Sequence, residues 1–439
     1  MLIDEFSSFE NKYLFEKKYD DFSYWVYSRY AIFSYLTKLQ EGIEMSSQKM
    51  TDGLICGIKN MIINSLRYRH KIKKIGHRDL LILNHERRVL KDGYYRCIYT
   101  EQIEEHYPNS VVLERPYFYK HLKPIQTERI FYSDCVELES LIYGFLECKL
   151  KAKKYRKAKK FFEKEMSIVA PEFQHMVKQE VSVEALSEML TRLYLLYCVK
   201  RKKFEKVIQK IQPKVILEVV SYNLDCMIFN EIAYEKKINT IELQHGVMSG
   251  SIAYYYPKNV LIKQFPQKVF LFSDYWKNCI SVPLEDKNVI SVGYPYFEEQ
   301  VKKYQKINRD KNKTTKVILF LSQWTIGENF SKFAVEFSNL INDKWKIIYK
   351  LHPGEYSNWK KRYPWLANSG IEVVDSLRHN IYEYFAISNV QVGVSSTAIF
   401  EGLGFGLDTF IFNGFSRVYE AVMSRWFCRR SKQCERIGG

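Results

Sequence analysis

The sequence lacks several features that would place the protein within a membrane or outside the cell. It has no stretch of about eighteen consecutive apolar residues, so we expect no membrane-spanning helix. The N-terminus carries Asp4, Glu5 and Glu10 where a secretory signal would have basic residues and an apolar core. The nine cysteines are odd in number and form no Cys-x-x-Cys pair, which is typical of a reducing compartment. We therefore expect a cytoplasmic protein, with attachment to the inner face of the cell membrane left open.

Signals for a metal centre and for nucleic-acid binding are also absent. No Asp-x-Asp element ends a predicted strand, and no spacing of His, Cys and Asp is typical of zinc, so we expect no metal and no cofactor. No zinc finger, basic zipper or RNP-type aromatic strand is present, which argues against nucleic acid. The formal net charge of +17 favours other anionic partners, namely phosphorylated substrates, acidic polysaccharides or anionic lipid.

The order of apolar runs predicts an α/β protein. Residues 1–75 have few strand signals and are expected to be helical. A first alternating unit, 76–300, contains short apolar runs such as 79–84 and 214–220, which are typical of buried strands. A stretch rich in Leu, Lys and Glu, at about 137–210, interrupts this unit and predicts a helical insertion. Strands that alternate with helices imply right-handed βαβ units and a parallel sheet.

A second alternating unit follows a polar segment. Residues 301–315 are rich in lysine and are interpreted as a linker between domains. Residues 316–439 then repeat the pattern, starting with the strand signal Lys316–Leu321. The sequence therefore predicts two Rossmann-like domains that face one cleft, with N-terminal and inserted helices added to the first.

Three short motifs each follow a predicted strand in the C-terminal half of the chain. They are Gln244-His245-Gly246, Lys350-Leu351-His352-Pro353 and Ser395-Ser396-Thr397. Ligands of open α/β sheets bind at the carboxyl ends of the strands, so we expect these motifs to line the binding site. Two imidazoles and a cluster of hydroxyls suit a phosphorylated ligand and a proton transfer. The leading interpretation is a transferase that uses an activated nucleotide donor.

The first motif is the candidate acceptor-side loop. Gly246 permits a tight turn or the close approach of a substrate next to Gln244 and His245. His245 is the candidate general base, because a neutral imidazole accepts a proton at cytosolic pH. The alternative is a structural histidine that is hydrogen-bonded at the end of a strand.

The second motif is a candidate part of the donor site. Pro353 and Gly354 turn the chain directly after His352, which would hold the imidazole at the edge of the sheet. There it would donate a hydrogen bond to a phosphate or to a base carbonyl. Lys350 precedes it at the end of the strand and adds a positive charge.

The third motif combines hydroxyls with the start of a predicted helix. The first N–H groups of a helix and the positive end of its dipole attract anions, so Ser395, Ser396 and Thr397 are candidate phosphate ligands. Glu401, one to two turns into that helix, is a candidate acceptor for ribose hydroxyls. The alternatives are that a serine only caps the helix and that Glu401 is a solvated surface residue.

With these residues the chain resembles the GT-B glycosyltransferases of bacterial surface polysaccharide synthesis. His245-Gly246, Lys350–Pro353 and Ser395-Ser396 match elements of the teichoic-acid glycerophosphotransferases, and His-Pro and Ser-Ser also occur in bacterial sialyl- and polysialyltransferases. The acidic base motif of the sialyltransferases has no match, since Phe297-Glu298-Glu299 lacks its glycine.

The resemblance implies a metal-independent glycosyltransferase. It would move a sugar from a nucleotide donor, with a cytidine nucleotide among the candidates, to a growing capsule or lipopolysaccharide chain or a lipid-linked acceptor. Inversion or retention stays open. The alternatives are a polyol-phosphate transferase of the CDP-glycerol type and a non-enzymatic binding module of a polysaccharide assembly complex.

Two amphipathic segments have competing interpretations. Lys149–Lys164 is densely basic and includes Phe161 and Phe162, so it would either dock on an anionic membrane surface or form a solvated helix face. An aromatic stripe between Phe22 and Phe33 is interpreted as core, with a membrane-facing stripe as the alternative.

Overall fold

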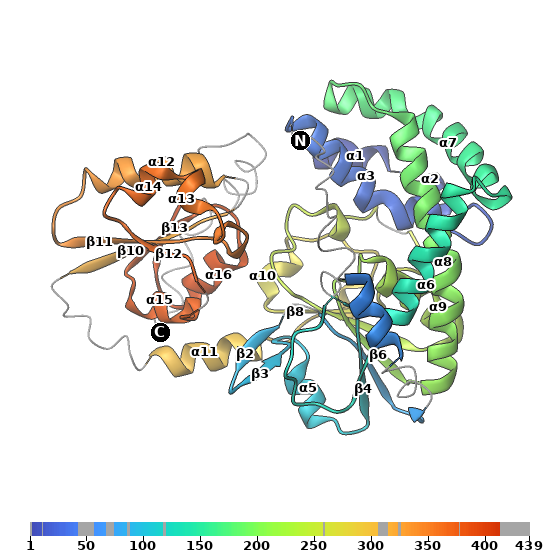
Figure 1. The fold of residues 1–439 in the computed structure, drawn as a ribbon, viewed down its shortest axis with the longest axis horizontal. Helices are drawn as coiled ribbons and strands as arrows, with labels where there is room; N and C mark the ends of the chain where they lie inside the picture. The colour runs from blue at the N-terminus through green and yellow to red at the C-terminus, as the bar shows by residue number, and fades with distance from the viewer. Residues whose placement is uncertain are drawn as a thin grey trace. The chain divides into compact units, whose positions relative to one another are not determined.

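The structure is a computed structural model that describes residues 2–10, 12–42, 57–66, 74–85, 88–116, 120–257, 260–305, 315–323, 326–376 and 378–412. The chain forms two compact units, Met1–Gly293 and Tyr294–Gly439. The first unit combines a seven-stranded sheet with a helical layer, and the second is built on a five-stranded sheet (Figure 1).

The sheet of the first unit is parallel throughout, in the order β5-β4-β1-β6-β7-β8-β9. The sequence order reverses between β1 and β6, so the topological switch point lies between these two strands. Ile82, Val112 and Leu217, from three adjacent strands, share one buried cluster. The strands are β1 (Leu80–Leu83), β4 (Ser110–Glu114), β5 (Ile130–Tyr132), β6 (Val215–Val219), β7 (Asn239–Leu243), β8 (Lys268–Leu271) and β9 (Val289–Ser291).

Helices of the first unit come from the N-terminus, from the insertion and from the crossovers between strands. The predicted insertion is three long helices, of which α8 packs against α6, α7 and the crossover helix α9, while the N-terminal α3 packs against α7 and α8 (Figure 1). Residues 57–66 are also helical. The named helices are α1 (Leu2–Phe9), α2 (Lys12–Glu16), α3 (Tyr24–Gln40), α5 (Glu101–His106), α6 (Asp134–Lys149), α7 (Lys153–Val177), α8 (Val183–Ile211), α9 (Leu224–Lys236), α10 (Asp274–Lys277), and the 3-10 turns η1 (Ile252–Tyr254) and η2 (Asp286–Asn288).

The aromatic stripe near the N-terminus is core, as the preferred interpretation predicted. Phe22 and Trp25 are fully buried, and Phe22 meets Phe162 of α7 in an edge-to-face contact. Phe161 packs on Tyr19, with ring centroids 4.7 Å apart. Both phenylalanines of the basic segment are therefore occupied in packing, and neither forms the apolar side that docking by Lys149–Lys164 would use.

A two-stranded hairpin was not predicted. β2 (Val89–Lys91) pairs antiparallel with β3 (Tyr94–Arg96) across a turn at Asp92 and Gly93, whose φ angles are 52° and 80°. Asp-Gly is the dipeptide that a two-residue turn with two positive φ angles favours. The signal was therefore present in the sequence.

The second unit carries its five parallel strands in the order β12-β11-β10-β13-β14, with the switch point between β10 and β13. Phe320, Tyr349 and Val392 contribute to its core. Its elements are α11 (Pro295–Gln305), β10 (Lys316–Leu321), α12 (Gly327–Ser338), β11 (Trp345–Lys350), η4 (Pro353–Glu355), α13 (Trp359–Arg362), α14 (Pro364–Ala367), β12 (Glu372–Val374), α15 (Ile381–Ile387), β13 (Val390–Gly393), α16 (Thr397–Gly404) and β14 (Asp408–Ile411).

The predicted fold class, an α/β protein with two Rossmann-like domains and added helices, is confirmed. The predicted linker 301–315 begins within α11, and residues 306–314 lie outside the described residues. The cleft between the domains stays a prediction.

Candidate functional site

His245 lies at the carboxyl edge of the first sheet, directly after β7. The Tyr99 hydroxyl donates a hydrogen bond to the His245 carbonyl oxygen at 2.7 Å. The imidazole ring centroid lies 6.0 Å from that of His85, which follows β1, and 6.2 Å from that of Tyr222, which follows β6. Residues that follow β1, β6 and β7 therefore meet at the switch point, where open α/β sheets bind ligands.

The loop that carries His245 is fixed by Gln244. The amide of this buried side chain donates to the Gly246 carbonyl oxygen at 2.8 Å, and its oxygen accepts from the Phe272 N–H at 2.8 Å. Phe272 follows β8, so one side chain joins the turn to the neighbouring strand end. The His245 backbone is thereby held from both sides, as a positioned catalytic side chain would require.

Two carboxyl groups lie side by side beneath this edge. Glu218 of β6 and Glu242 of β7 are paired residues in the parallel ladder, so their side chains share one face of the sheet, and both are fully buried. Burial, and next the charge of Glu242, raise the pKa of Glu218 to about 8. Burial also raises the pKa of Glu242, although the Ser221 N–H and the Tyr254 hydroxyl donate to it. The pair therefore carries at least one proton at neutral pH.

The carboxyl pair is connected to the histidine cluster. Tyr254 donates to Glu242 at 2.7 Å, and its ring meets Tyr222 edge-on at 5.8 Å. Val220, between β6 and Tyr222, has a φ of 68°, a backbone conformation that is strained for a β-branched residue. Buried acids and backbone strain both cost stability, and they cluster at functional sites.

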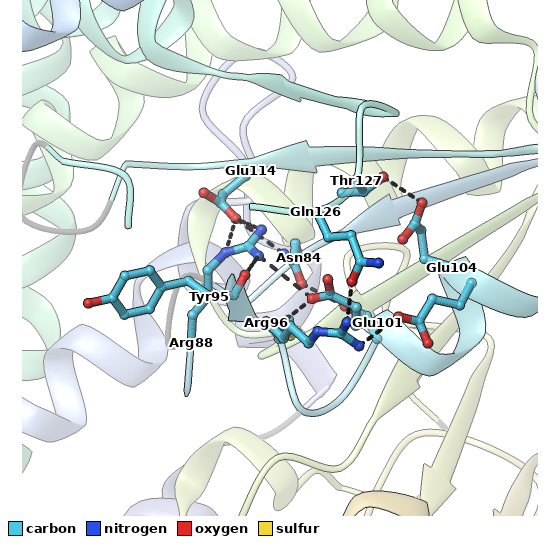
Figure 2. Close-up of polar contacts among 12 residues, drawn as sticks. Asn84, Arg88, Tyr95, Arg96, Glu101, Glu104, Glu114, Gln126 and Thr127 are labelled. Atoms are coloured by element: carbon cyan, nitrogen blue, oxygen red, sulfur yellow. Dashed lines mark hydrogen bonds and ion pairs between the residues drawn. The ribbon is translucent and has the colours of Figure 1, made fainter. Parts of the chain in front are cut away.

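A second polar network lies at the same edge of the sheet, around the end of β4 (Figure 2). Glu114, at the end of β4, accepts from Arg88 Nε at 2.7 Å and from Asn84 Nδ2 at 3.2 Å, and the Arg88 NH2 group also contacts it. Arg88 NH1 donates to the Tyr95 carbonyl oxygen at 3.0 Å, which ties the hairpin to the strand end. Because Arg88 and Glu114 are buried and share several hydrogen bonds, this network is a rigid support.

His121 is a structural histidine within this support. Its ring donates to or accepts from Glu114 at 2.9 Å and Asp134 at 2.7 Å, and it stacks on Tyr132 with centroids 3.7 Å apart. Burial lowers the pKa of His121, but the hydrogen bonds to Asp134 and Glu114 outweigh it and raise the pKa. Because both of its ring nitrogens are engaged by carboxylates, His121 is not placed to act as a base toward a ligand.

A cavity of about 30 Å³ lies at the ends of β1, β4 and β6, near the N-terminus of α9. Its polar lining includes Asn84, Arg115, Ser133, Asn223 and Asp225. The cavity therefore lies at the switch point of this sheet, where open α/β sheets bind ligands.

In the second unit, Lys350 is the last residue of β11, and His352 lies two residues further along the chain. Gly354 N–H donates to His352 Nδ1 at 3.1 Å, so a neutral ring carries its proton on Nε2. The His352 backbone N–H donates to the buried Glu355 at 2.8 Å, which fixes the turn that Pro353 was predicted to make. Burial lowers the pKa of Lys350 to about 8, and its ammonium contacts the Tyr356 hydroxyl.

Ser395 and Ser396 lie between β13 and α16, and Thr397 is the first residue of α16, beside the switch point of the second sheet. Ser396 is the N-cap residue of α16, but its side chain makes no capping hydrogen bond to the described residues. Simple side-chain capping therefore does not explain it. A Cβ at Gly393 would lie 2.5 Å from Ile399 Cδ1, so this glycine lets α16 approach the strand closely. Ser395, Ser396 and Thr397 are all partly exposed.

Glu401 lies one turn further along α16 and is partly buried. Its carboxylate accepts from the Tyr382 hydroxyl at 3.1 Å, and Tyr382 stacks on Phe405 with centroids 5.8 Å apart. The structure therefore gives Glu401 a protein partner in place of the solvated state, and its role toward ribose stays a prediction.

Several residues of this site were not predicted from the sequence. His85, Tyr99 and Tyr222 carry no motif of their own, although His85 and Tyr222 follow predicted strands, as His245 does. Glu218 and Glu242 were visible as acidic residues within apolar strands. Such a break in the pattern is itself a signal of function.

Among the described residues, no group of three or more His, Cys, Asp or Glu side chains is placed to hold a metal ion. None of the described helices is both long enough and apolar enough to cross a membrane. The metal-independent mechanism stays a prediction.

No protein-family model matches the sequence, and no curated protein matches it. Among solved structures, the chain is similar to the UDP-GlcNAc 2-epimerase of Methanocaldococcus jannaschii, with 11% identity and a TM-score of 0.44 over 78% of this chain and 86% of that one. It is also similar to the UDP-GlcNAc 2-epimerase of Neisseria meningitidis, with 12% identity and a TM-score of 0.42 over 81% and 92% of the two chains. The wall teichoic acid polymerase TagF is similar at 11% identity and a TM-score of 0.41, over 84% and 79%. These similarities concern the fold alone.

Proposed function

We propose that the chain is an enzyme that transfers a group from a nucleotide-activated donor, and more specifically a GT-B-type glycosyltransferase of bacterial surface polysaccharide synthesis. The observation that carries the proposal is the placement of all three motifs at the carboxyl ends of parallel strands, where such sheets bind ligands. Two Rossmann-like units are also what a GT-B fold requires.

The second unit is proposed to bind the donor. Ser395, Ser396 and Thr397 offer hydroxyls next to the uncapped first turn of α16, a suitable place for a phosphate. The buried Lys350 ammonium would be stabilised by a bound anion, because burial disfavours its charge. His352 would donate from Nε2 to a phosphate or to the base of the donor. Together these groups would stabilise the charge on a departing nucleotide without a metal ion.

The first unit is proposed to present the acceptor and the base. His245 would take the proton from an acceptor hydroxyl as its oxygen bonds to the anomeric carbon. The bond from that carbon to the donor phosphate breaks, and the nucleotide leaves with the electron pair. Positioning by the Gln244 and Tyr99 hydrogen bonds would contribute to the rate, since a misplaced base loses much of its effect.

A polyol-phosphate transferase of the CDP-glycerol type is the second candidate. It is favoured by the match of His245-Gly246, Lys350–Pro353 and Ser395-Ser396 to the elements of teichoic-acid glycerophosphotransferases. In that reaction the acceptor oxygen attacks phosphorus, and cytidine monophosphate leaves. The same residues would serve, since both reactions need a base and a site for the nucleotide phosphates.

The test begins with a panel of nucleotides. A ligand that binds only the folded protein raises the melting temperature, so a cytidine or uridine nucleotide should give a shift that the others do not. Nucleotide sugars and CDP-glycerol are then offered with oligosaccharide and lipid-linked acceptors, with and without chelator. Sugar transfer supports the first candidate and glycerol phosphate transfer the second. Absence of any nucleotide-dependent shift or turnover would leave the non-enzymatic binding module as the better interpretation.

A further inference from the structure

An apolar surface on the first unit belongs neither to its core nor to the site described above. On α6 and its C-cap residue, five large apolar side chains are between 41% and 72% exposed. They are Leu141, Ile142, Phe145, Leu146 and Leu150. At 100° per residue these positions fall on one side of the helix, and over about 14 Å of its length they form a continuous stripe.

The helix at residues 57–66 also exposes apolar side chains to the surface. Met61 is fully buried and Asn64 is partly buried, while apolar residues face outward. The outward residues are Ile58, Ile62, Ile63 and Leu66. A surface helix of a soluble protein normally turns its apolar face to the core. Asn64 donates to Asp134 in the first turn of α6 at 3.0 Å, so the two helices are neighbours.

Basic residues border this apolar surface. Lys149 lies within the stripe of α6, with its ammonium 5.6 Å from the Phe145 ring centroid. The corner between α6 and α7 adds further exposed cations, namely Lys151, Lys153, Arg156, Lys157 and Lys160. Exposed apolar patches of this kind mark an interaction surface, and their charged border indicates the kind of partner.

We propose that this surface, defined by the outward residues of helix 57–66 and α6 and by the basic corner, docks on an anionic lipid bilayer. Leucine, isoleucine and phenylalanine side chains would enter the boundary between headgroups and acyl chains, and the cations would meet lipid phosphates. A second copy of the chain is disfavoured as the occupant, since a two-fold contact would bring the same cations together. The proposal does not rest on the proposed function, because none of these residues belongs to the transferase site.

The docking assigned here differs from docking by the aromatic face of Lys149–Lys164. Phe162 is buried in the core and the partly buried Phe161 packs on Tyr19, so the apolar contribution comes from α6 and helix 57–66. Lys154 and Lys159 are also engaged within the protein, because Lys154 contacts Cys198 and Lys159 donates to Ser187 at 3.0 Å. Substitution of these two lysines would therefore disturb packing as well as charge.

The test is co-sedimentation of the full chain with vesicles of phosphatidylcholine, with and without phosphatidylglycerol. An apolar variant changes Leu141, Phe145 and Leu146 to Ser, and a basic variant changes Lys149, Lys151 and Lys153 to Gln. Ile168→Ser with Leu340→Ser is the matched control, since these side chains are 65% and 82% exposed elsewhere. All sites are exposed, so each variant should fold, and equal melting temperatures check this.

Wild type and control should bind anionic vesicles better than neutral ones. The apolar variant should bind anionic vesicles at least roughly tenfold more weakly, because it lacks three apolar side chains that would enter the bilayer. The basic variant should bind more weakly at low salt and approach wild type at high salt, where surface charge is screened. As a second measurement, Phe145→Trp should add fluorescence that brominated lipid quenches.

Two results would overturn the proposal. One is equal binding of the apolar variant and the wild type to anionic vesicles, together with an unquenched Trp at position 145. The other is concentration-dependent dimerisation of the wild type in sedimentation velocity without lipid, abolished in the apolar variant, which would assign the surface to a second copy. Nucleotide-induced stabilisation, measured in parallel, should be the same in all variants, so failure of docking and failure of the proposed function remain distinguishable.

Discussion

Replacement of Arg29 by methionine should strongly destabilise the first unit. Arg29 lies on α3 and is 1% exposed. Its Nε donates to Glu10 Oε1 at 2.7 Å, and its other nitrogens donate to Glu10 Oε2 and to the carbonyl oxygens of Ile252 and Tyr255, the last two both at 2.6 Å. The guanidinium also lies over the Tyr256 ring, 4.2 Å from its centroid. Arg29 therefore joins the N-terminal helices to the segment that follows the His245 loop.

The expected magnitude follows from what the substitution leaves behind. Methionine approximates the length of the arginine stem but donates no hydrogen bond, so among the described residues the fully buried Glu10 carboxylate keeps the Trp25 indole N–H, at 2.8 Å, as its donor. Loss of one partner from a buried ion pair costs about 3–5 kcal/mol. In a unit as large as Met1–Gly293 each kcal/mol lowers the melting temperature by somewhat less than about 2 °C, so a decrease of about 5–8 °C is expected.

The assay is urea unfolding of wild type, Arg29→Met, Glu10→Leu and the double variant. The double variant removes both charges, so it should be more stable than the sum of the single effects predicts, by roughly 1–3 kcal/mol. A single variant that stays within about 1 kcal/mol of wild type would refute the buried-pair argument. So would strict additivity in the double-mutant cycle, because contacting partners must show coupling.

The remaining predictions concern the proposed site. His245→Ala should lower turnover by roughly a hundredfold or more while nucleotide affinity stays near wild type, since a general base contributes about that much; full activity in the folded variant would exclude it as the base. Ser396→Ala and His352→Ala should each weaken nucleotide binding by roughly ten- to a hundredfold in calorimetric titration, the usual effect of losing a charge-assisted hydrogen bond, and unchanged affinity in both would place the donor elsewhere. The pKa of Glu218 is raised from 4.5 to about 8, so between these pH values the folded state binds a proton that the unfolded state releases. The stability that this proton contributes is complete below about pH 4.5 and is lost as pH rises through 8. Glu218→Gln should flatten that fall in melting temperature, and an identical pH profile in both proteins would contradict the shift.

The strands could be predicted because each is a short apolar run between polar residues. Lys316–Leu321 forms the predicted strand at the same boundaries, and the strand expected at 214–220 is observed as Val215–Val219. β5, Ile130–Tyr132, was missed, although the equally short β9 and β12 were expected at 289–292 and 371–374. Length alone therefore does not decide whether an apolar run is recognised as a strand.

The composition of the site could be predicted only in part. The strand-end rule identified His245, but it does not say which strands are neighbours, and only the fold brings His85 and Tyr222 to it. β1 and β6 are more than one hundred residues apart in the chain and adjacent in the sheet. A single sequence carries no direct record of that adjacency, because strand order is decided by long-range packing.

Some of the costs to stability lie where the proposed chemistry lies. Two fully buried acids on paired strands, and a β-branched residue with φ of 68° two positions after one of them, all oppose folding. In the helical layer the buried Arg29 and Glu10 are paired with each other, and the aromatic rings around them are packed. A residue that serves stability alone can be replaced by a less costly one. A strained or buried acidic residue at a strand end is instead expected where function requires it. The ends of β6 and β7, and not the polar support around Glu114, are therefore where substitutions should separate activity from stability.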